Sequence, residues 1–424
     1  MSGPRELRSY QLRAVDYGIK HPYSILALDP GLGKSFCAIK IREHSKLNCL
    51  IVCPAYLISN WENELRLGAD SGYSATVFRK GSDLYDIFDS DYAIISYDLA
   101  QKAEWLFKWA EVLILDESHM LANQSTKRTQ FFHRVIYENS LKRVIQLTGT
   151  PIKNRTEEFY SLLAICNYDP SLKKSEFLDR FPDSITFADY FSHRREYTIQ
   201  VGHRFVRIVK WEGIKRTDEL KKWLTGHYLR IKSEDVLELP PISYKEVLMS
   251  ETPDTELLNA FNSFVEESGD SVDPTAKAQA ALKKAPITVQ YVKNLLEEVD
   301  CVVVYSDHVE ASEFIAKAFN TVALNGSVSS QRRMDIAMKF QAGEGKVLVA
   351  TIKAMSVGIN LTRASHMVLN DFCWTPGDLK QTVYRVQRLG QQKPCVVHEI
   401  VGSPQDKYIK DVIKSKMGVI ERAT

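Results

Sequence analysis

The feature that most constrains this chain is a repeated alternation of short apolar runs with longer segments of helical spacing. Each short run is apolar at consecutive positions, so the strand that it predicts is buried on both faces. Strands of this kind, separated by helices, form a parallel sheet that is covered by helices on both sides. In the first 165 residues the predicted strands are 24–28, 49–53, 92–96, 112–115 and 144–147.

The same alternation returns after residue 280 and predicts a second α/β body. Between the two bodies the pattern fails, and the chain is rich in aromatic and basic residues until Pro240 and Pro241. We therefore predict an α/β chain in three parts, with a first body at 1–168, an insertion at 169–245 and a second body at 246–424. The strands predicted in the second body are 299–305, 321–324, 347–350, 366–370 and 396–400.

The composition is that of a globular protein without an overall charge bias. A chain of 424 residues is long enough for two or three domains. Hydrophobic residues at 44% and charged residues at 25% exclude a disordered or collagenous chain. The net charge of only +2 excludes a uniformly basic nucleic-acid binder, so any site for a polyanion must be local.

Cysteine spacing and hydropathy give no sign of a metal cluster or a membrane segment. The seven cysteines are scattered, without a CxxC pair or a histidine spacing that suits zinc, so we expect reduced thiols. No apolar run approaches the roughly 20 residues that span a bilayer, and the N-terminus lacks the apolar core of a secretion signal. We therefore expect a soluble protein of the cytoplasm with no membrane partner.

Residues 28–35, Leu-Asp-Pro-Gly-Leu-Gly-Lys-Ser, follow a predicted strand and begin a helical run. Glycines let backbone N–H groups converge on phosphate oxygens at the start of a helix, while Lys34 supplies a cation and Ser35 a Mg²⁺ ligand. Asp29 stands where the general motif has its first glycine, so the match is to the variant GxGKS. The alternative interpretation is a tight strand-to-helix turn with an exposed lysine.

Two further strand ends carry groups that suit nucleotide hydrolysis. Asp116 would hold Mg²⁺ and Glu117 would orient the attacking water, although an acidic pair at a strand end is also a common cap. Residues 148–151 place two hydroxyls after another strand, where they can sense a γ-phosphate or simply form a polar turn. His119 follows Glu117 too closely to be a base for the same water, and we expect it to couple the ATP site to this turn.

In the second body, Gln381, Arg385 and Arg388 are spaced i, i+4 and i+7, which predicts that they project from one helix face. Two guanidinium groups on one edge of the second body can stabilise charge that develops on a γ-phosphate. The alternative is a solvated basic helix face.

In this order, the motifs resemble those of superfamily 2 helicases, and in particular the SWI/SNF-like branch of double-strand DNA translocases. Within that branch, the box at 116–119, Gly326 with Ser327, and residues 372–377 are most similar to the annealing-helicase and fork-remodelling group. Gln387 stands where the family has His, and the additional N-terminal modules of larger members are absent, which disfavours nucleosome remodelling and indicates a compact phage or bacterial form. Residues 8–11 resemble the motif in which a glutamine, here Gln11, contacts adenine. Further matching segments are 53–57 with Trp61, 96–97, 228–241, 305–306, 324–327 with Arg332 and Arg333, and 351–360.

The resemblance implies two RecA-like lobes in tandem, with ATP and Mg²⁺ as cofactors. The residues expected to act in catalysis are Lys34, Asp116, Glu117, Arg385 and Arg388, with Ser35 and Asp116 on the metal. The residues expected at the nucleotide are Gln11, Pro30, Gly31, Leu32, Gly33, Lys34, Ser35, Thr148, Gly358, Asn360 and Gln381. Those expected at DNA phosphates, where contacts carry no sequence information, are Pro54, Ala55, Ser96, Tyr97, Asn123, Ser306, Gly326, Ser327, Arg332, Thr351 and Trp374.

A basic segment at 193–216 lies outside these motifs. It holds seven basic and two acidic residues, a local charge of +5. Apolar runs at 197–201 and 205–211, separated by Gly202 and His203, predict a β-hairpin. Such a hairpin would be a hook at a duplex junction, or else a structural hairpin that packs its apolar side on a lobe. In the hook, phosphates would meet Arg204, Arg207 and Lys210, and exposed bases would meet Tyr197, Phe205 or Trp211.

We therefore expect an ATP-dependent DNA helicase or translocase that acts as a monomer on forked or branched DNA. Fork unwinding, reannealing and branch migration in replication, recombination or repair are the expected outcomes. One alternative is a duplex translocase that displaces or repositions bound proteins without strand separation. Another is a nucleotide-switched DNA clamp, which Glu117 and the two distal arginines disfavour. If a phage encodes the chain, the expected location is the host cytoplasm.

Overall fold

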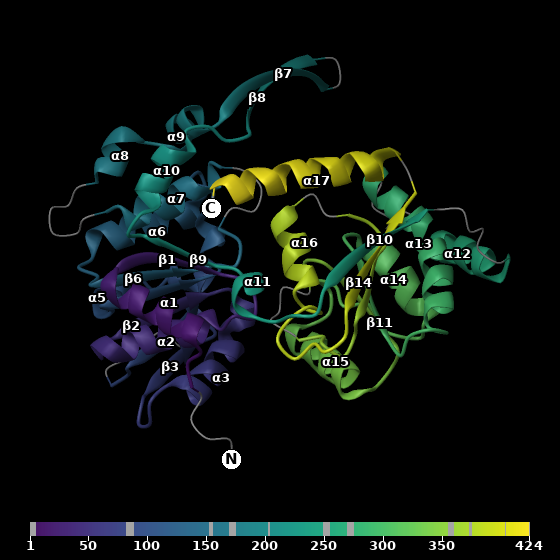
Figure 1. Cartoon of the computed structure of the whole chain (residues 1–424), viewed down its shortest axis with the longest axis horizontal. Helices are drawn as coiled ribbons and strands as arrows, with labels where there is room; N and C mark the ends of the chain where they lie inside the picture. Colours follow the sequence, from purple (N-terminus) through teal and green to yellow (C-terminus); the bar gives the residue numbers. More distant parts are fainter. Residues whose placement is uncertain are drawn as a thin grey trace. The chain divides into compact units, whose positions relative to one another are not determined.

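A computed structural model describes residues 6–81, 89–151, 156–168, 175–201, 204–248, 255–268, 275–354, 360–372, 375–402 and 404–423. The chain forms two compact units, Met1–Val236 with Lys416–Thr424, and Leu237–Ser415. Each unit is built on a parallel sheet with helices packed against it (Figure 1). The predicted α/β class with two sheets is confirmed.

The sheet of the first unit has seven strands in the order β3-β4-β2-β5-β6-β1-β9, all parallel to their neighbours. All five predicted strands are present, each within one residue of the expected ends. The outermost strands β3 and β9 were not predicted, because they are short and only partly buried. The strands are β1 Tyr23–Leu28, β2 Cys49–Cys53, β3 Ala75–Phe78, β4 Tyr92–Ser96, β5 Val112–Asp116, β6 Arg143–Leu147 and β9 Tyr228–Ile231.

The segment predicted as an insertion contributes to the core of the first unit. Phe177, Phe187 and Leu220 pack in one buried cluster with Ile25 and Ala27 of β1. The aromatic richness of the segment therefore extends an existing core. The helical elements of the unit are α1 Ser9–Lys20, α2 Lys34–Ser45, η1 Ala55–Leu57, α3 Ile58–Gly68, α4 Tyr97–Ala100, α5 Trp105–Trp109, η3 Ser118–Leu121, α6 Lys127–Glu138, α7 Glu158–Cys166, α8 Glu176–Arg180, α9 Ser184–Phe191, α10 Thr217–Leu224 and α11 Ser233–Val236.

The predicted hairpin is present as an antiparallel pair, β7 His193–Val201 and β8 Arg204–Glu212. Val201 lies opposite Arg204, so the connection is the two-residue segment Gly202-His203, which is outside the described residues. At its base, the indole of Trp211 donates a hydrogen bond to Asp189 of α9 (2.6 Å). A two-stranded ribbon is only marginally stable alone, so this attachment helps to hold it.

The sheet of the second unit has five parallel strands in the order β10-β14-β13-β11-β12. The strand predicted at 321–324 was wrong: Thr321 still bonds to Ala316 at the end of α14 (3.0 Å), and only Leu324 forms a bridge, to Ala350. The elements are β10 Ile242–Leu248, α12 Thr255–Ser268, α13 Ala276–Leu295, β11 Val302–Ser306, α14 Val309–Ala318, α15 Ser330–Ala342, β12 Val347–Thr351, β13 His366–Leu369, α16 Pro376–Val383, β14 Cys395–Val401 and α17 Pro404–Ala423.

The described residues also show the state of the cysteines, the hydropathy of the helices and the arrangement of side chains that could bind a metal ion. The six cysteines among the described residues are buried and not bonded to one another. Within the same part of the chain, no helix combines the length and apolarity needed to cross a bilayer, and no group of three or more acidic, histidine or cysteine side chains is arranged to hold a metal ion.

A buried ion pair attaches the edge strand β9 to its neighbour β1. The guanidinium of Arg230 pairs with the carboxylate of Asp29, which is fully buried. The same carboxylate accepts hydrogen bonds from the backbone N–H (2.9 Å) and hydroxyl (3.0 Å) of Ser233. Arg230 also donates to the carbonyl of Ala27 (2.7 Å), its partner in the strand register. Three donor groups of Arg230 and Ser233 thus fix the position of the Asp29 carboxylate.

We expect Arg230→Met to lower the free energy of unfolding by about 3–5 kcal/mol, because it leaves the Asp29 carboxylate buried without a countercharge. Denaturant unfolding followed by tryptophan fluorescence measures this, since five of the six tryptophans lie in residues 1–236. Arg134→Met is the control: Arg134 is 46% exposed and pairs with Glu104 and Glu138, and exposed pairs contribute little. A loss no larger than in the control would contradict the anchoring role.

Candidate nucleotide and DNA site

Three of the predicted motifs meet at one edge of the first sheet. Strand β6 lies between β5 and β1, and the carboxyl ends of parallel strands share one edge. The loop at 29–33 follows β1, the acidic pair ends β5, and the turn at 148–151 follows β6. Motifs that are more than 80 residues apart in sequence are therefore neighbours in space.

The loop after β1 is shaped for an anion. Gly31 (φ 88°) and Gly33 (φ 78°) adopt left-handed backbone conformations, which glycine adopts without strain. Gly33 caps the N-terminus of α2 and has no side chain, so no side-chain oxygen occupies the first N–H groups of this helix. Lys34 begins the helix and donates across the loop to the carbonyl of Leu28 (3.2 Å). Converging N–H groups beside a lysine suit a phosphate group.

The departure from the general motif at Asp29 has a structural explanation. Its carboxylate is the one that Arg230 and Ser233 hold, so this position anchors the loop to β9 and α11. The partners lie about 200 residues away, at the end of the first unit. No local signal in the sequence could have identified them.

The acidic pair lies at the end of β5 in a strained conformation. Glu117 has a positive φ of 51°, which is uncommon for a residue other than glycine and is often found at functional sites. Asp116 is buried, and its carboxylate accepts hydrogen bonds from the Glu117 N–H (3.0 Å) and the indole of Trp61 (2.8 Å). Burial, and then the neighbouring charge of Glu117, raise the pKa of Asp116 to about 7.

This donor set fits a divalent cation. Mg²⁺ prefers oxygen ligands, and the Ser35 hydroxyl in the first turn of α2 and the Asp116 carboxylate at the end of β5 can supply them. A bound cation would also favour the ionised form of a carboxyl group whose pKa is raised by burial. Ser35 and Asp116 are the residues that would hold it.

The expected coupling role of His119 agrees with its contacts. The Nδ1 atom of His119 lies 3.1 Å from Oε2 of Glu117 and 3.4 Å from Oγ1 of Thr148. The following glycine, Gly149, packs so closely on the phosphate loop that a Cβ there would lie 3.1 Å from Cδ of Pro30. The third motif thus contacts both the acidic pair and the loop.

Gln11, which was expected to contact adenine, braces the phosphate loop in this structure. Its side-chain Nε2 donates to the carbonyl of Leu32 (3.0 Å), and its Oε1 accepts from the N–H of Arg8 (3.0 Å). The side chain is buried within α1. The adenine contact remains a prediction, and the bracing contact is an addition to it.

In the second unit, the prediction that Gln381, Arg385 and Arg388 share one helix face was wrong. Helix α16 ends at Val383, so only Gln381 lies on it. The chain then tightens into turns, because the N–H of Arg385 bonds to Thr382 (3.1 Å) and its carbonyl accepts from Leu361 (2.9 Å). Burial, and then the charge of Arg385, lower the pKa of Arg388 to about 10.

The remaining expected nucleotide residues of the second unit are only partly described. Asn360 is exposed, and Gly358 lies outside the described residues. Gln387, which stands where the family has His, donates from Nε2 to the carbonyl of Pro240 (2.9 Å) and so fastens this turn to the start of β10.

The residues expected at DNA divide into an exposed and a buried set. The exposed set is Ala55, Asn123, Gly326, Ser327 and Arg332; the buried set is Pro54, Ser96, Tyr97, Ser306 and Thr351. Trp374 is outside the described residues, and Arg204 lies in β8 with a side chain that is not described. Residues of the buried set can offer a phosphate their backbone groups but not a free side chain.

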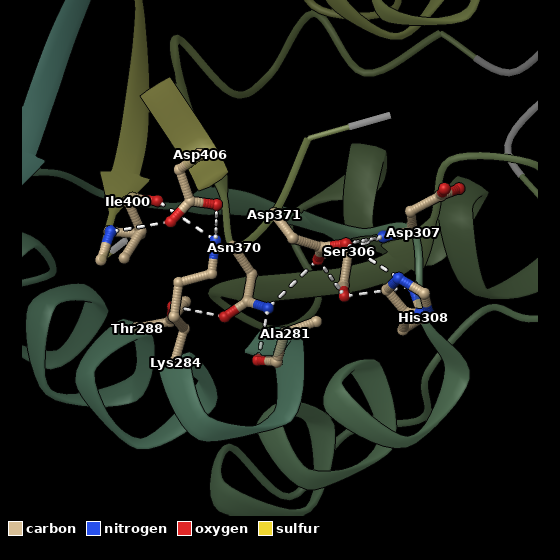
Figure 2. Close-up of polar contacts among 11 residues, drawn as sticks. Ala281, Lys284, Thr288, Ser306, Asp307, His308, Asn370, Asp371, Ile400 and Asp406 are labelled. Atoms are coloured by element: carbon tan, nitrogen blue, oxygen red, sulfur yellow. Dashed lines mark hydrogen bonds and ion pairs between the residues drawn. The ribbon is translucent and has the colours of Figure 1, made fainter. Parts of the chain in front are cut away.

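Ser306 illustrates this in the second unit. Its hydroxyl donates to Asp371, which also accepts from the backbone N–H of Asp307 (3.1 Å) and from Asn370 (3.1 Å) (Figure 2). Asp371 thus shapes the turn that follows β11. Nearby, Lys284 of α13 and Asp406 of α17 form a second buried ion pair (2.8 Å), also drawn in Figure 2.

Several known proteins are similar to this chain. The DNA annealing helicase and endonuclease ZRANB3 of Bos taurus is 25% identical over 94% of this chain and 38% of its own length. The SWI/SNF-related matrix-associated actin-dependent regulator of chromatin subfamily A-like protein 1 of Xenopus tropicalis is 27% identical over 98% of this chain and 45% of its own length. The DNA repair and recombination protein RAD54 of Saccharomyces cerevisiae is 25% identical over 89% of this chain and 50% of its own length. The chain thus spans half or less of the length of these relatives.

Among solved structures, the Sulfolobus solfataricus SWI2/SNF2 ATPase core in complex with dsDNA is 22% identical, and the TM-score is 0.46. The match covers 98% of this chain and 92% of the Sulfolobus chain. Two domain families match the sequence directly. The Helicase conserved C-terminal domain matches residues 287–390, and the SNF2-related domain matches residues 10–251, which is more than half of the chain. The chain belongs to the SNF2-related family.

Proposed function

We propose that this chain is an ATP-hydrolysing DNA motor. The observation that carries the proposal is the meeting of the phosphate loop, with Lys34 and Ser35, and the acidic pair at one edge of a parallel sheet. Both parts are needed near a single γ-phosphate for hydrolysis. Membership of the SNF2-related family supports the same activity.

Each of the candidate catalytic groups has a part in the proposed reaction. The loop N–H groups and Lys34 bind the triphosphate, and Ser35 and Asp116 hold Mg²⁺, which when bound neutralises phosphate charge. Glu117 orients the attacking water and accepts its proton. Arg385 and Arg388 of the second unit stabilise the charge that develops on the γ-phosphate.

The proposed substrate is forked or branched DNA, which the chain would unwind, reanneal or migrate in replication, recombination or repair. The names of the relatives support this class, since they include a DNA annealing helicase and a DNA repair and recombination protein. Gln11, Gly358, Asn360 and Gln381 are proposed to complete the ATP site, and the protein is proposed to act as a monomer in the cytoplasm. Translocation on intact duplex with displacement of bound protein is the second candidate.

The hairpin supports a preference for branched DNA. None of its described side chains is buried in the first unit, so the interpretation as a ribbon packed on its own lobe has no support there. Trp211 is held by Asp189, and Tyr197 is held by Glu212 (2.7 Å), so each of these two rings is tethered to a carboxylate by a hydrogen bond at its edge. Phe205 lies next to the turn and is 74% exposed, which makes it the aromatic residue best placed to stack on a base.

We expect Lys34→Ala and Glu117→Gln each to lower DNA-stimulated ATP hydrolysis by at least about 100-fold, because they remove a phosphate ligand and the group that orients water. DNA affinity, measured by fluorescence anisotropy, should change little. Lys142→Ala and Glu138→Gln, which alter exposed residues away from this edge, are the matched controls. Substantial turnover in either site variant would refute the assignment.

Comparing ATP hydrolysis on different DNA structures distinguishes the candidate functions. We expect forks and four-way junctions to stimulate hydrolysis more than linear duplex or single strands, and we expect strand displacement or reannealing on a fork. Equal stimulation by linear duplex, with displacement of a bound protein but no strand separation, would favour the duplex translocase. Tight nucleotide-dependent binding with slow turnover on every substrate would indicate a clamp.

Reversing the hairpin charge tests the hook. Arg207→Glu with Lys210→Glu should weaken fork binding and lower the slope of log affinity against log salt by about two, roughly one per lost phosphate contact. The control is Lys20→Glu with Lys142→Glu, which makes the same charge change at the amino-terminal ends of strands. A hairpin variant with the wild-type slope would contradict the hook.

Phe205→Ala separates stacking from phosphate binding. This change should leave the salt slope as in the wild type and reduce strand separation on a fork, because only the exposed ring is removed. Val206→Ala, at the neighbouring exposed position, is its control. Unchanged strand separation in Phe205→Ala would remove the ring from the mechanism.

A further inference from the structure

Two separate segments donate hydrogen bonds to one residue, Asp116. The indole Nε1 of Trp61, on α3, donates to carboxylate Oδ2 (2.8 Å). The hydroxyl of Tyr97, at the start of α4, donates to the main-chain carbonyl of the same residue (2.9 Å). Trp61 is 0% exposed and Tyr97 is 1% exposed, so both bonds are shielded from water.

The sheet order makes Asp116 a boundary residue. Strand β5 lies between β2 and β6. On the β2 side, the segments after β2 and β4 are those expected to contact DNA. On the β6 side, β6 and β1 lead into the turn at 148–151 and the phosphate loop. Asp116 thus lies where the two halves of this edge meet, and both donors reach it from the DNA half.

The two donors belong to the same segments as the expected phosphate contacts. Ala55 is exposed and begins the short helix η1 after β2, and η1 leads directly into α3, which carries Trp61. Ser96 directly precedes Tyr97, and its side chain caps α4 by accepting from Leu99 (3.3 Å). A shift of either segment on binding a phosphate would therefore move a donor that fixes Asp116.

Such a bond ordinarily forms because the N–H of a buried Trp or the O–H of a buried Tyr needs a hydrogen-bond acceptor. Any nearby carbonyl would serve that purpose. Here both groups select the same residue, and one of them bonds to the carboxylate that is suited to hold the metal ion. A hydrogen bond to an ionised group in a buried site is stronger than an average one and fixes orientation.

We propose that Trp61 and Tyr97 are positioning residues that couple DNA occupancy of the segments after β2 and β4 to the metal-holding carboxylate of Asp116. This inference rests on the proposed ATP- and DNA-dependent function and specifies how the two sites communicate. Neither residue touches a reacting atom. Thermodynamic coupling is reciprocal, so DNA and Mg²⁺-nucleotide should each tighten the binding of the other by the same factor.

The test uses Trp61→Phe, Tyr97→Phe and the double variant of the full chain. Tyr97→Phe removes only the hydroxyl donor, whereas Trp61→Phe removes the N–H donor together with part of the ring system and keeps an aromatic ring. Two readouts are binding constants: the affinity for a non-hydrolysable ATP analogue with Mg²⁺, with and without duplex DNA, and the affinity for duplex, with and without that nucleotide. The third readout is the ratio of DNA-stimulated to basal hydrolysis.

The chain offers a matched control for each variant. Tyr23→Phe removes another buried phenol that donates to a main-chain carbonyl, that of Leu141 (2.9 Å), at the opposite end of the strands. Trp105→Phe makes the Trp-to-Phe change at a half-exposed ring that packs on Phe78. Both controls should keep the wild-type coupling factor even if they lower thermal stability.

We expect the coupling factor and the stimulation ratio to fall about tenfold in the single variants, a size typical of coupling between two sites. In Trp61→Phe, whose side chain is not among the expected DNA contacts, DNA affinity without nucleotide should stay within about twofold. Wild-type coupling in all three variants, or an equal fall in the controls, would overturn the inference. A wild-type protein in which DNA affects neither nucleotide affinity nor hydrolysis would instead overturn the proposed function.

Discussion

Parallel strand pairing is the constraint on which the rest of the first unit depends. In a parallel sheet every strand arrives at the same edge with its carboxyl end, so groups that follow different strands become neighbours whatever their separation in sequence. The adjacency of β1, β6 and β5 gathers the phosphate loop, the polar turn and the acidic pair. The same pairing places the segments after β2 and β4 beside them, so one edge serves both expected ligands.

Buried charged and polar groups fix the positions of the loops at this edge, and each of these groups is held by a partner from a distant part of the chain. Asp29 is held by Arg230, and Asp116 is held by Trp61. In the second unit Asp371 holds the turn after β11. Because a buried polar group without a partner is costly, these contacts leave the loops few alternative conformations. The loops are therefore positioned by a network as well as by their own sequence.

Much of the fold and of the candidate nucleotide site could be predicted from local sequence signals. Apolar runs located five of the seven strands of the first sheet to within one residue, and the Gly-Leu-Gly-Lys-Ser segment located the loop after β1. Prediction failed where the local signal was weak or misleading. The edge strands β3 and β9 are short and half exposed, and the regular spacing of Gln381, Arg385 and Arg388 does not reveal that α16 ends at Val383.

The sequence by itself determined which residues can carry the chemistry, since a phosphate loop, an acidic pair and a strand period are properties of adjacent residues. Only the tertiary structure decided which of these residues touch. The hydrogen bonds from Tyr97 and Trp61 to Asp116, and the ion pair of Arg230 with Asp29, join positions that are 19, 55 and 201 residues apart. Such contacts depend on strand order and on the satisfaction of buried polar groups, which no local pattern encodes.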